Sequence, residues 1–191
     1  MSQRLCQSYV AKLEEQIDCL SGIITRLPSE KLDWIPKLPK MDVPLPRSLG
    51  QVLGHLLQCL AGIAAVLYAV YPRELEQLLQ LKSLPVNHFC GKSEALERIA
   101  GYRDRLAYGF RFLTDEDLAR RIPTVFVPDG ETVLTLLLGN FEHLVNHKHE
   151  LFMCAKFVGV PLGSRDLYRF RTELASACNS VSQATMSKKH E

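Results

Sequence analysis

The sequence lacks the charge patterns by which proteins bind nucleic acids or membrane surfaces. Its 23 basic residues nearly balance its 21 acidic residues, and the formal net charge is +2. A chain so close to neutral offers no basic surface for a nucleic acid. It also has no block of positive residues that would hold it on an anionic membrane. We therefore expect neither a nucleic acid nor a membrane as a partner.

The chain also lacks the cysteine patterns of metal ribbons and disulfide scaffolds. Its six cysteines form no CxxC pair, and their spacing is too wide for a zinc ribbon or a dense set of disulfides. The first residues lead directly into amphipathic sequence with acidic residues, and no signal peptide is recognisable there. We therefore expect a cytoplasmic protein with free thiols.

What is present is an ordinary globular composition of one domain's length. The chain has 191 residues, of which 47% are hydrophobic and 23% are charged. This composition excludes a disordered or fibrous protein. A domain of this size buries about 70% of its unfolded surface, so it needs no disulfide or metal to fold.

One uncharged segment is long enough to cross a bilayer, namely the 22 residues from Leu49 to Val70. It carries Gln51, His55 and Gln58 at spacings that place them on one helical face. Three polar side chains in hydrocarbon are costly unless they line a protein interior. We therefore expect a buried bundle helix rather than a membrane span.

Apolar residues recur every three or four positions in four long segments, which is the period of an amphipathic helix. The segments that we expect to be helical are residues 5–27, 48–71, 94–113 and 131–158. Shorter helical pieces are expected at residues 74–84 and 115–121, and a hairpin or turn arm at 122–130. The expected N-caps are Ser48, Ser93 and Thr114.

A proline-rich connection lies between the first two helices. Residues 28–46 contain five prolines and the single tryptophan, Trp34. Such a run is neither a helix nor a central strand, and its length suggests a long crossover over one end of a bundle. The predicted fold class is therefore all-α, a four-helix bundle. We expect the bundle to span residues 1–163, a C-terminal helical extension 164–180 and a flexible tail 181–191.

Two stripes of polar or small residues interrupt the apolar second and fourth helices. The first stripe comprises Ser48, Gln51, His55, Cys59 and Gly62. The second stripe comprises Asn140, His143, His147, Glu150 and Cys154. Unsatisfied buried polar groups cost on the order of a few kcal/mol each, so we expect the two stripes to face each other. They would form a polar pocket with three imidazoles at its floor.

The residues alone leave two interpretations of these histidines open. His143 and His147 form an HxxxH pair, a spacing that lets two imidazoles on one helical face bind the same metal ion. Bundle cores are a known place for such sites. Alternatively, His55 and the pair are hydrogen-bonded core residues without a metal.

The order of these features resembles the DinB/YfiT-like superfamily of metalloenzymes, over a span from about Leu5 to Val160. The first signature of that family is a tryptophan and proline connector leading into a helix with an early histidine, here EKLDWIPKLPKMDVPLPRSLGQVLGHLLQCL. The second is a late helix with two histidines four apart and a closing glycine, here LLLGNFEHLVNHKHELFMCAKFVGVP. Gly159 lies 12 positions after His147, as the family pattern requires.

The resemblance implies a four-helix bundle with a divalent metal ion held by His55, His143 and His147. Imidazole ligands suit several metals, and we expect zinc or nickel, with iron as a further alternative. Many relatives have Arg-Gly-Gln after the second histidine, whereas this chain has Lys148-His149-Glu150. Glu150 would be a fourth ligand, a hydrogen-bond acceptor for an imidazole or a general base. His149 is expected at the surface.

Two cysteines, Cys59 and Cys154, lie one turn beyond His55 and Glu150. Either could supply sulfur to the metal, although a buried core cysteine is the commoner role.

Characterised relatives resemble thiol-dependent S-transferases and isomerases, and others are described as metal-dependent hydrolases. We therefore expect a homodimeric metalloenzyme that activates a low-molecular-weight thiol or water for attack on an electrophilic small molecule. The alternative is a non-catalytic helical bundle that acts as a dimeric stress-response or interaction module. Metal content separates the two hypotheses.

Overall fold

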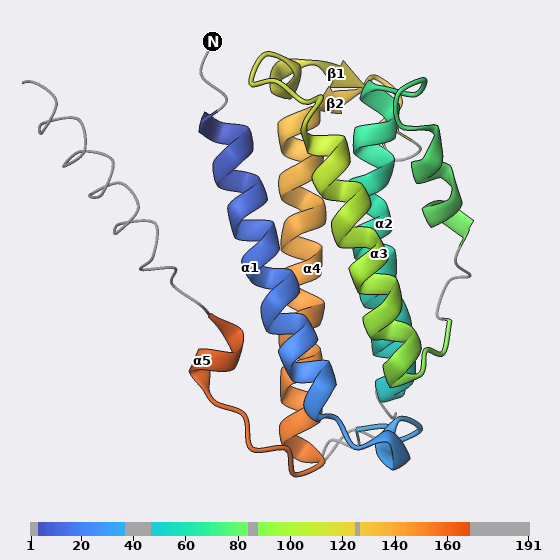
Figure 1. Ribbon diagram of the computed structural model, residues 1–191, viewed down its shortest axis with the longest axis vertical. Coiled ribbons are helices and arrows are strands. Elements are labelled where there is room, and N and C mark those ends of the chain that lie inside the picture. The colour runs from blue at the N-terminus through green and yellow to red at the C-terminus, as the bar shows by residue number, and fades with distance from the viewer. Residues whose placement is uncertain (1–3, 37–46, 84–87, 125–126, 169–191) are drawn as a thin grey trace, which may run out of the picture.

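The computed structural model describes residues 4–36, 47–83, 88–124 and 127–168. Within this part of the chain four long helices run side by side as a bundle (Figure 1). They are α1 (Arg4–Arg26), α2 (Leu49–Val70), α3 (Lys92–Phe110) and α4 (Val133–Phe157). The predicted all-α four-helix bundle is confirmed.

The helices are antiparallel in part, with α1 and α4 running in one direction and α2 and α3 in the other (Figure 1). The start of α2 lies beside the segment before α3, because the Cys90 amide donates to the Gly50 carbonyl at 2.9 Å. The chain therefore returns along the bundle between α2 and α3. The proline-rich connection joins adjacent ends of α1 and α2, and its residues 37–46 lie outside the described residues.

Short elements cover the ends of the bundle. Three are 3-10 turns: η1 (Ser29–Lys31), η2 (Glu76–Ser83) and η3 (Asp117–Ala119). The expected hairpin consists of β1 (Arg121–Ile122) and β2 (Glu131–Thr132), which pair antiparallel with Arg121 opposite Thr132. A one-turn helix, α5 (Ser164–Leu167), follows α4.

Several expected boundaries were wrong. The expected helix at 74–84 is the 3-10 turn η2, and the one at 115–121 shrinks to η3. The N-cap of α3 is Gly91 rather than Ser93, since its carbonyl already accepts from the Ala95 amide at 2.9 Å. Bonds between residues three apart tighten the end of α3, so it stops at Phe110 rather than at residue 113.

The expected C-terminal extension is described only as far as residue 168. Within it, α5 spans four residues, Ser164–Leu167. The rest of the segment, and the tail expected at 181–191, lie outside the described residues.

Side-chain caps fix where the two site-bearing helices begin. The Ser48 hydroxyl accepts from the Gln51 amide, and the Gln51 side chain accepts in return from the Ser48 amide at 2.9 Å. This capping box is the predicted start of α2. The Thr132 hydroxyl accepts from the Thr135 amide at 3.2 Å to start α4. Gly159 ends α4 with φ of +91°, a conformation that glycine adopts without strain.

Helix α2 is the core helix of the bundle. Within the described residues, it is the one helix long and apolar enough to cross a membrane, and 61% of its most apolar stretch is buried inside the protein. Such burial is the pattern of a core helix in a bundle, so this finding is weak evidence for a membrane span. The expectation that Leu49 to Val70 packs as a bundle helix is confirmed.

Two glycines let α2 approach its neighbours closely on two sides. A Cβ atom at Gly62 would lie 2.0 Å from Oδ1 of Asn140 on α4. A Cβ atom at Gly54 would lie 1.7 Å from the backbone oxygen of His88, just before α3. Neither position can accept a side chain unless its neighbour moves, and at Gly54 that neighbour is backbone.

A buried lysine ties α5 to the bundle. Lys148 is only 1% exposed, and its ammonium group donates to the Gln16 side chain on α1 and to the Leu167 carbonyl of α5 at 2.6 Å. Burial lowers the pKa of Lys148. Arg26 at the end of α1 forms a second link, an ion pair with Asp166.

We predict that Gly54→Ala destabilises the protein by about 1–3 kcal/mol, because the new methyl group must displace the His88 backbone. The matched control is Gly101→Ala on α3, where nothing lies within 4 Å of the added atom. That variant should gain about 0.5–1 kcal/mol, the difference in helix propensity. Urea unfolding measures both values. Equal effects of the two substitutions would contradict the close approach at Gly54.

Candidate metal centre

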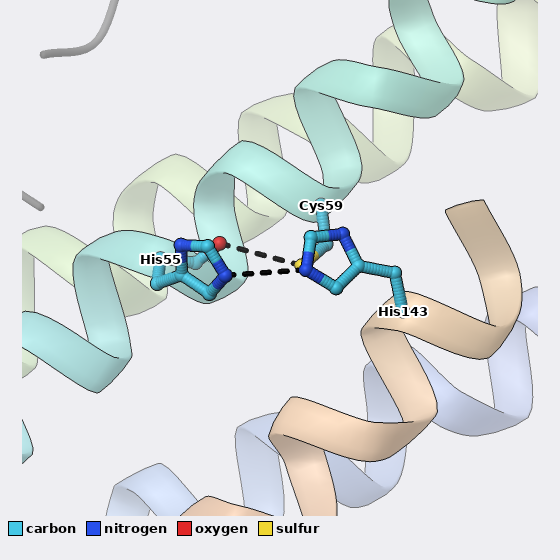
Figure 2. A group of neighbouring side chains, drawn as sticks. All are labelled: His55, Cys59 and His143. Atoms are coloured by element: carbon cyan, nitrogen blue, oxygen red, sulfur yellow. Dashed lines mark hydrogen bonds between the residues drawn. The ribbon is translucent and has the colours of Figure 1, made fainter. Parts of the chain in front are cut away.

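Three histidines from two helices converge between α2 and α4. His55 lies on α2, and His143 and His147 lie one turn apart on α4. The Nε2 atom of His55 is 3.2 Å from Nε2 of His143 and 3.0 Å from Nε2 of His147. Figure 2 shows the rings of His55 and His143 pointing toward each other across the helix interface.

The two polar stripes predicted from the sequence do face each other along the antiparallel pair α2 and α4. At one end Gly62 of α2 meets Asn140 of α4, and the histidines meet in the middle. At the other end Arg47, which precedes α2, lies 4.0 Å from the Glu150 carboxylate. The packing of the helices therefore sets the register that brings the three imidazoles together.

Hydrogen bonds on the far side of two rings determine where their protons sit. Nδ1 of His55 lies 2.9 Å from Oε1 of Gln58, and Nδ1 of His147 lies 2.6 Å from Oε2 of Glu150. A carboxylate oxygen and an amide oxygen only accept hydrogen bonds, so we assign the ring proton to Nδ1 in both cases. A neutral ring with its proton on Nδ1 presents a bare lone pair at Nε2.

The unprotonated Nε2 atoms of His55 and His147 thus lie 3.0 Å apart, with the two rings nearly perpendicular. Two lone pairs at that distance repel unless a proton or a metal ion lies between them. Metal–imidazole bonds are about 2.0–2.1 Å long, so two ligands of one ion stand about 3.0–3.4 Å apart. The observed separations of 3.0 and 3.2 Å fit that spacing. The donor set is able to hold one divalent ion.

The surroundings lower the pKa of two of the rings. Burial is the main cause that lowers the pKa of His55 and of His143, and the neighbouring His147 and then Arg47 lower both further. The hydrogen bond from His55 to Gln58 acts in the opposite direction without reversing the shift. Neutral imidazoles are the form that binds metals.

Cys59 lies beside the histidines as a protonated thiol. Its sulfur is within 4.8 Å of the ligand nitrogens of His55 and His143. The thiol donates to the His55 backbone oxygen at 3.4 Å (Figure 2), and burial raises its pKa to about 12. Cys154 is buried, and burial raises its pKa to about 11. Both thiols are therefore uncharged core groups in this structure.

The remaining predicted site residues also have definite places. Glu150 is half-buried and accepts from His147, as described above. His149 is exposed, as expected, and its ring stacks on Phe152. Arg47 was not predicted, although its position directly before the capping serine was visible in the sequence.

A second group of potential ligands was also missed. His88, Cys90 and Glu94 place their ligand atoms within 4.8 Å of one another at the start of α3. His88 Nε2 lies 3.1 Å from Oε1 of Glu94, and Arg98 donates to the same oxygen at 2.8 Å. The Cys90 thiol also bonds to Glu94, and burial raises its pKa to about 12. The Glu94 carboxylate thus forms hydrogen bonds with His88, Cys90 and Arg98. The run HFCGKSE could have revealed the cluster.

An apolar cavity of about 220 Å³ lies elsewhere in the bundle. It is lined by α1, the end of α3 and the first half of α4, with walls that include Leu5, Tyr9, Phe110, Leu137 and Phe141. The residues that line it include none of the three histidines. It is therefore separate from the polar site.

The fold and the site together define an all-α bundle with a histidine cluster between its second and fourth helices. The chain belongs to the DinB superfamily, whose family model matches residues 12–151. This confirms the resemblance noted in the sequence. The DinB superfamily is generally associated with metal ions.

Among solved structures, a DinB-like protein, YjoA, from Bacillus subtilis is similar to this chain. The two share 17% sequence identity with a TM-score of 0.57, over 81% of this chain and 96% of that chain. At this identity the similarity demonstrates the fold alone. No curated protein sequence matches the chain.

We predict that the stability of chelator-treated protein rises between pH 5 and pH 7. The pKa values of His55 and His143 are lowered from 6.5. Below 6.5 the unfolded chain therefore takes up protons more readily than the folded one, and this favours unfolding. Urea titrations at each pH measure the slope.

His143→Ala should reduce that slope, whereas the exposed control His149→Ala should reduce it less. Equal slopes in the wild type and His143→Ala would show that the cluster does not resist protonation.

Proposed function

We propose that this protein is a metal-dependent enzyme in which His55, His143 and His147 hold one divalent ion. The observation that carries the proposal is the convergence of the ring nitrogens, with Nε2 of His55 3.0 Å from Nε2 of His147 and 3.2 Å from Nε2 of His143. A cation bound there removes the repulsion between the lone pairs. Membership of a generally metal-associated superfamily supports the same proposal.

Zinc and nickel are the ions that we propose, with iron as the alternative, because imidazole nitrogen suits all three. Three neutral ligands leave the charge of the ion uncompensated and its coordination sphere open, which is the pattern of catalytic sites. When bound, such an ion lowers the pKa of a coordinated water or thiol toward neutral pH.

Glu150 is proposed to position His147. Its contact of 2.6 Å with Nδ1 supports the role of hydrogen-bond acceptor, which fixes the ring's tautomer and orientation. A role as general base or as a fourth ligand needs the carboxylate to leave this contact. The buried thiols of Cys59 and Cys154 are proposed as core residues.

The reaction class that we propose is transfer of a low-molecular-weight thiol, or of water, to an electrophilic small molecule. The open positions on an ion held by three imidazoles give either nucleophile a place to bind. A cytoplasmic location is proposed with it, supported by the free thiols of Cys6, Cys59, Cys90 and Cys154. The expected homodimer stays a prediction.

Protein purified without a histidine tag should contain about one divalent ion per chain. His143→Ala should lose most of that ion because one of three ligands is gone, whereas the exposed control His149→Ala should retain it. Elemental analysis measures the content. Substoichiometric metal that is unchanged in His143→Ala would instead favour the non-catalytic bundle.

The same preparations should be tested with cellular thiols against an activated aryl halide, and with water against an activated ester. Activity should follow the metal content and disappear with a chelator. Glu150→Gln should lower metal affinity or activity about 10–100-fold, as loss of a hydrogen-bonding partner of a ligand does. Activity that survives complete removal of the metal would contradict the proposal.

A further inference from the structure

Arg47 places a positive charge at the edge of the histidine cluster. It immediately precedes the capping serine of α2, and its side chain is 24% exposed. Its charge acts on His55, on His143 and on Cys59. The guanidinium therefore lies at the Glu150 end of the cluster, with Nη1 4.0 Å from the carboxylate that accepts from His147.

One nitrogen of this guanidinium is buried without a partner. Nη1 of Arg47 is shielded from solvent and makes no hydrogen bond with any residue that the structure describes. A buried N–H group that lacks an acceptor is unfavourable, and more so when the group is charged. The site thus contains a donor that some acceptor should satisfy.

The nearest acidic side chain does not supply that acceptor. Oε2 of Glu150 lies 4.0 Å from Nη1, which is too long for a hydrogen bond. The same oxygen already accepts from His147 at 2.6 Å. If Glu150 turned to Arg47, it would give up the contact that fixes the His147 tautomer. Glu150 therefore leaves the Arg47 guanidinium without a hydrogen-bond acceptor among the described residues, and the side chain is partly exposed.

The charge of the site favours an anion as that ligand. Three neutral imidazoles around a divalent ion carry a net charge of two, and Arg47 adds one more, against the single carboxylate of Glu150. A partly enclosed positive site attracts anionic molecules and disfavours cationic ones. Among anions, a carboxylate matches the planar geometry of a guanidinium.

We propose that Arg47 selects small-molecule ligands that carry a carboxylate, which accepts a hydrogen bond from the partly exposed guanidinium while the ligand's nucleophilic group reaches the histidine cluster. This inference rests on the proposed function. It specifies that the substrate or the thiol co-substrate of the proposed metal site is negatively charged. Arg47 is a specificity residue in this account. It takes no part in holding the metal.

A pair of thiols that differ in charge tests the role of Arg47. The protein is loaded with cobalt(II), whose absorption spectrum reports thiol binding, and titrated with 3-mercaptopropionate or with the uncharged 3-mercapto-1-propanol. The wild type should bind the carboxylate thiol about tenfold or more tightly, as a charge-assisted hydrogen bond provides. Arg47→Gln should abolish the preference while keeping the cobalt and the affinity for the uncharged thiol.

Two further measurements test the role of Arg47 if Arg47→Gln folds poorly. Raising the salt concentration of the wild type should weaken binding of the carboxylate thiol more than that of the uncharged thiol. Arg47→Lys should retain part of the preference, because it keeps the charge and loses the planar fork. The control Lys156→Gln removes an exposed cation of α4 and should leave the preference unchanged.

The outcomes separate this inference from the proposed function. A wild type that binds no cobalt overturns the proposed metal site, and the selectivity inferred here falls with it. Bound cobalt with equal affinities for the two thiols overturns the role of Arg47 alone. So does a preference for the carboxylate thiol that persists in Arg47→Gln.

Discussion

The contact on which the site depends is the approach of two imidazole lone pairs between α2 and α4. With the ring protons of His55 and His147 assigned to the outer nitrogens beside Gln58 and Glu150, the two inner nitrogens lie 3.0 Å apart without a proton. Such a contact is unfavourable without a cation between the rings. The fold therefore maintains an arrangement that a bound ion would stabilise, as metal sites do when binding is coupled to folding.

This arrangement follows from the packing of two antiparallel helices. The capping box at Ser48 sets the start of α2, and Gly62 lets α2 approach Asn140 closely enough for the polar stripes to meet. The same register brings Arg47 to the Glu150 end of the site. Helix packing thus places the three histidines, the hydrogen-bond acceptors of two of them and a nearby positive charge in one row.

The sequence predicted the features that depend on local spacing, including the bundle and the convergence of His55 with the HxxxH pair. It did not predict features that depend on neighbours distant in the chain. Whether the Arg47 guanidinium lacks a partner depends on a glutamate of another helix. The burial of Lys148 depends on α1 and α5. The cap of α3 was misplaced because Ser93 is the better capping residue by type, while the backbone bond begins at Gly91.

The central claim is that three imidazoles share one ion, and X-ray absorption on the zinc-loaded protein tests it most directly. The account predicts three imidazole nitrogens at about 2.0–2.1 Å from zinc, with the remaining position filled by a light atom and no sulfur. A zinc–sulfur shell at about 2.3 Å would mean that a cysteine binds the ion. That result, or fewer than three imidazoles, would contradict the account.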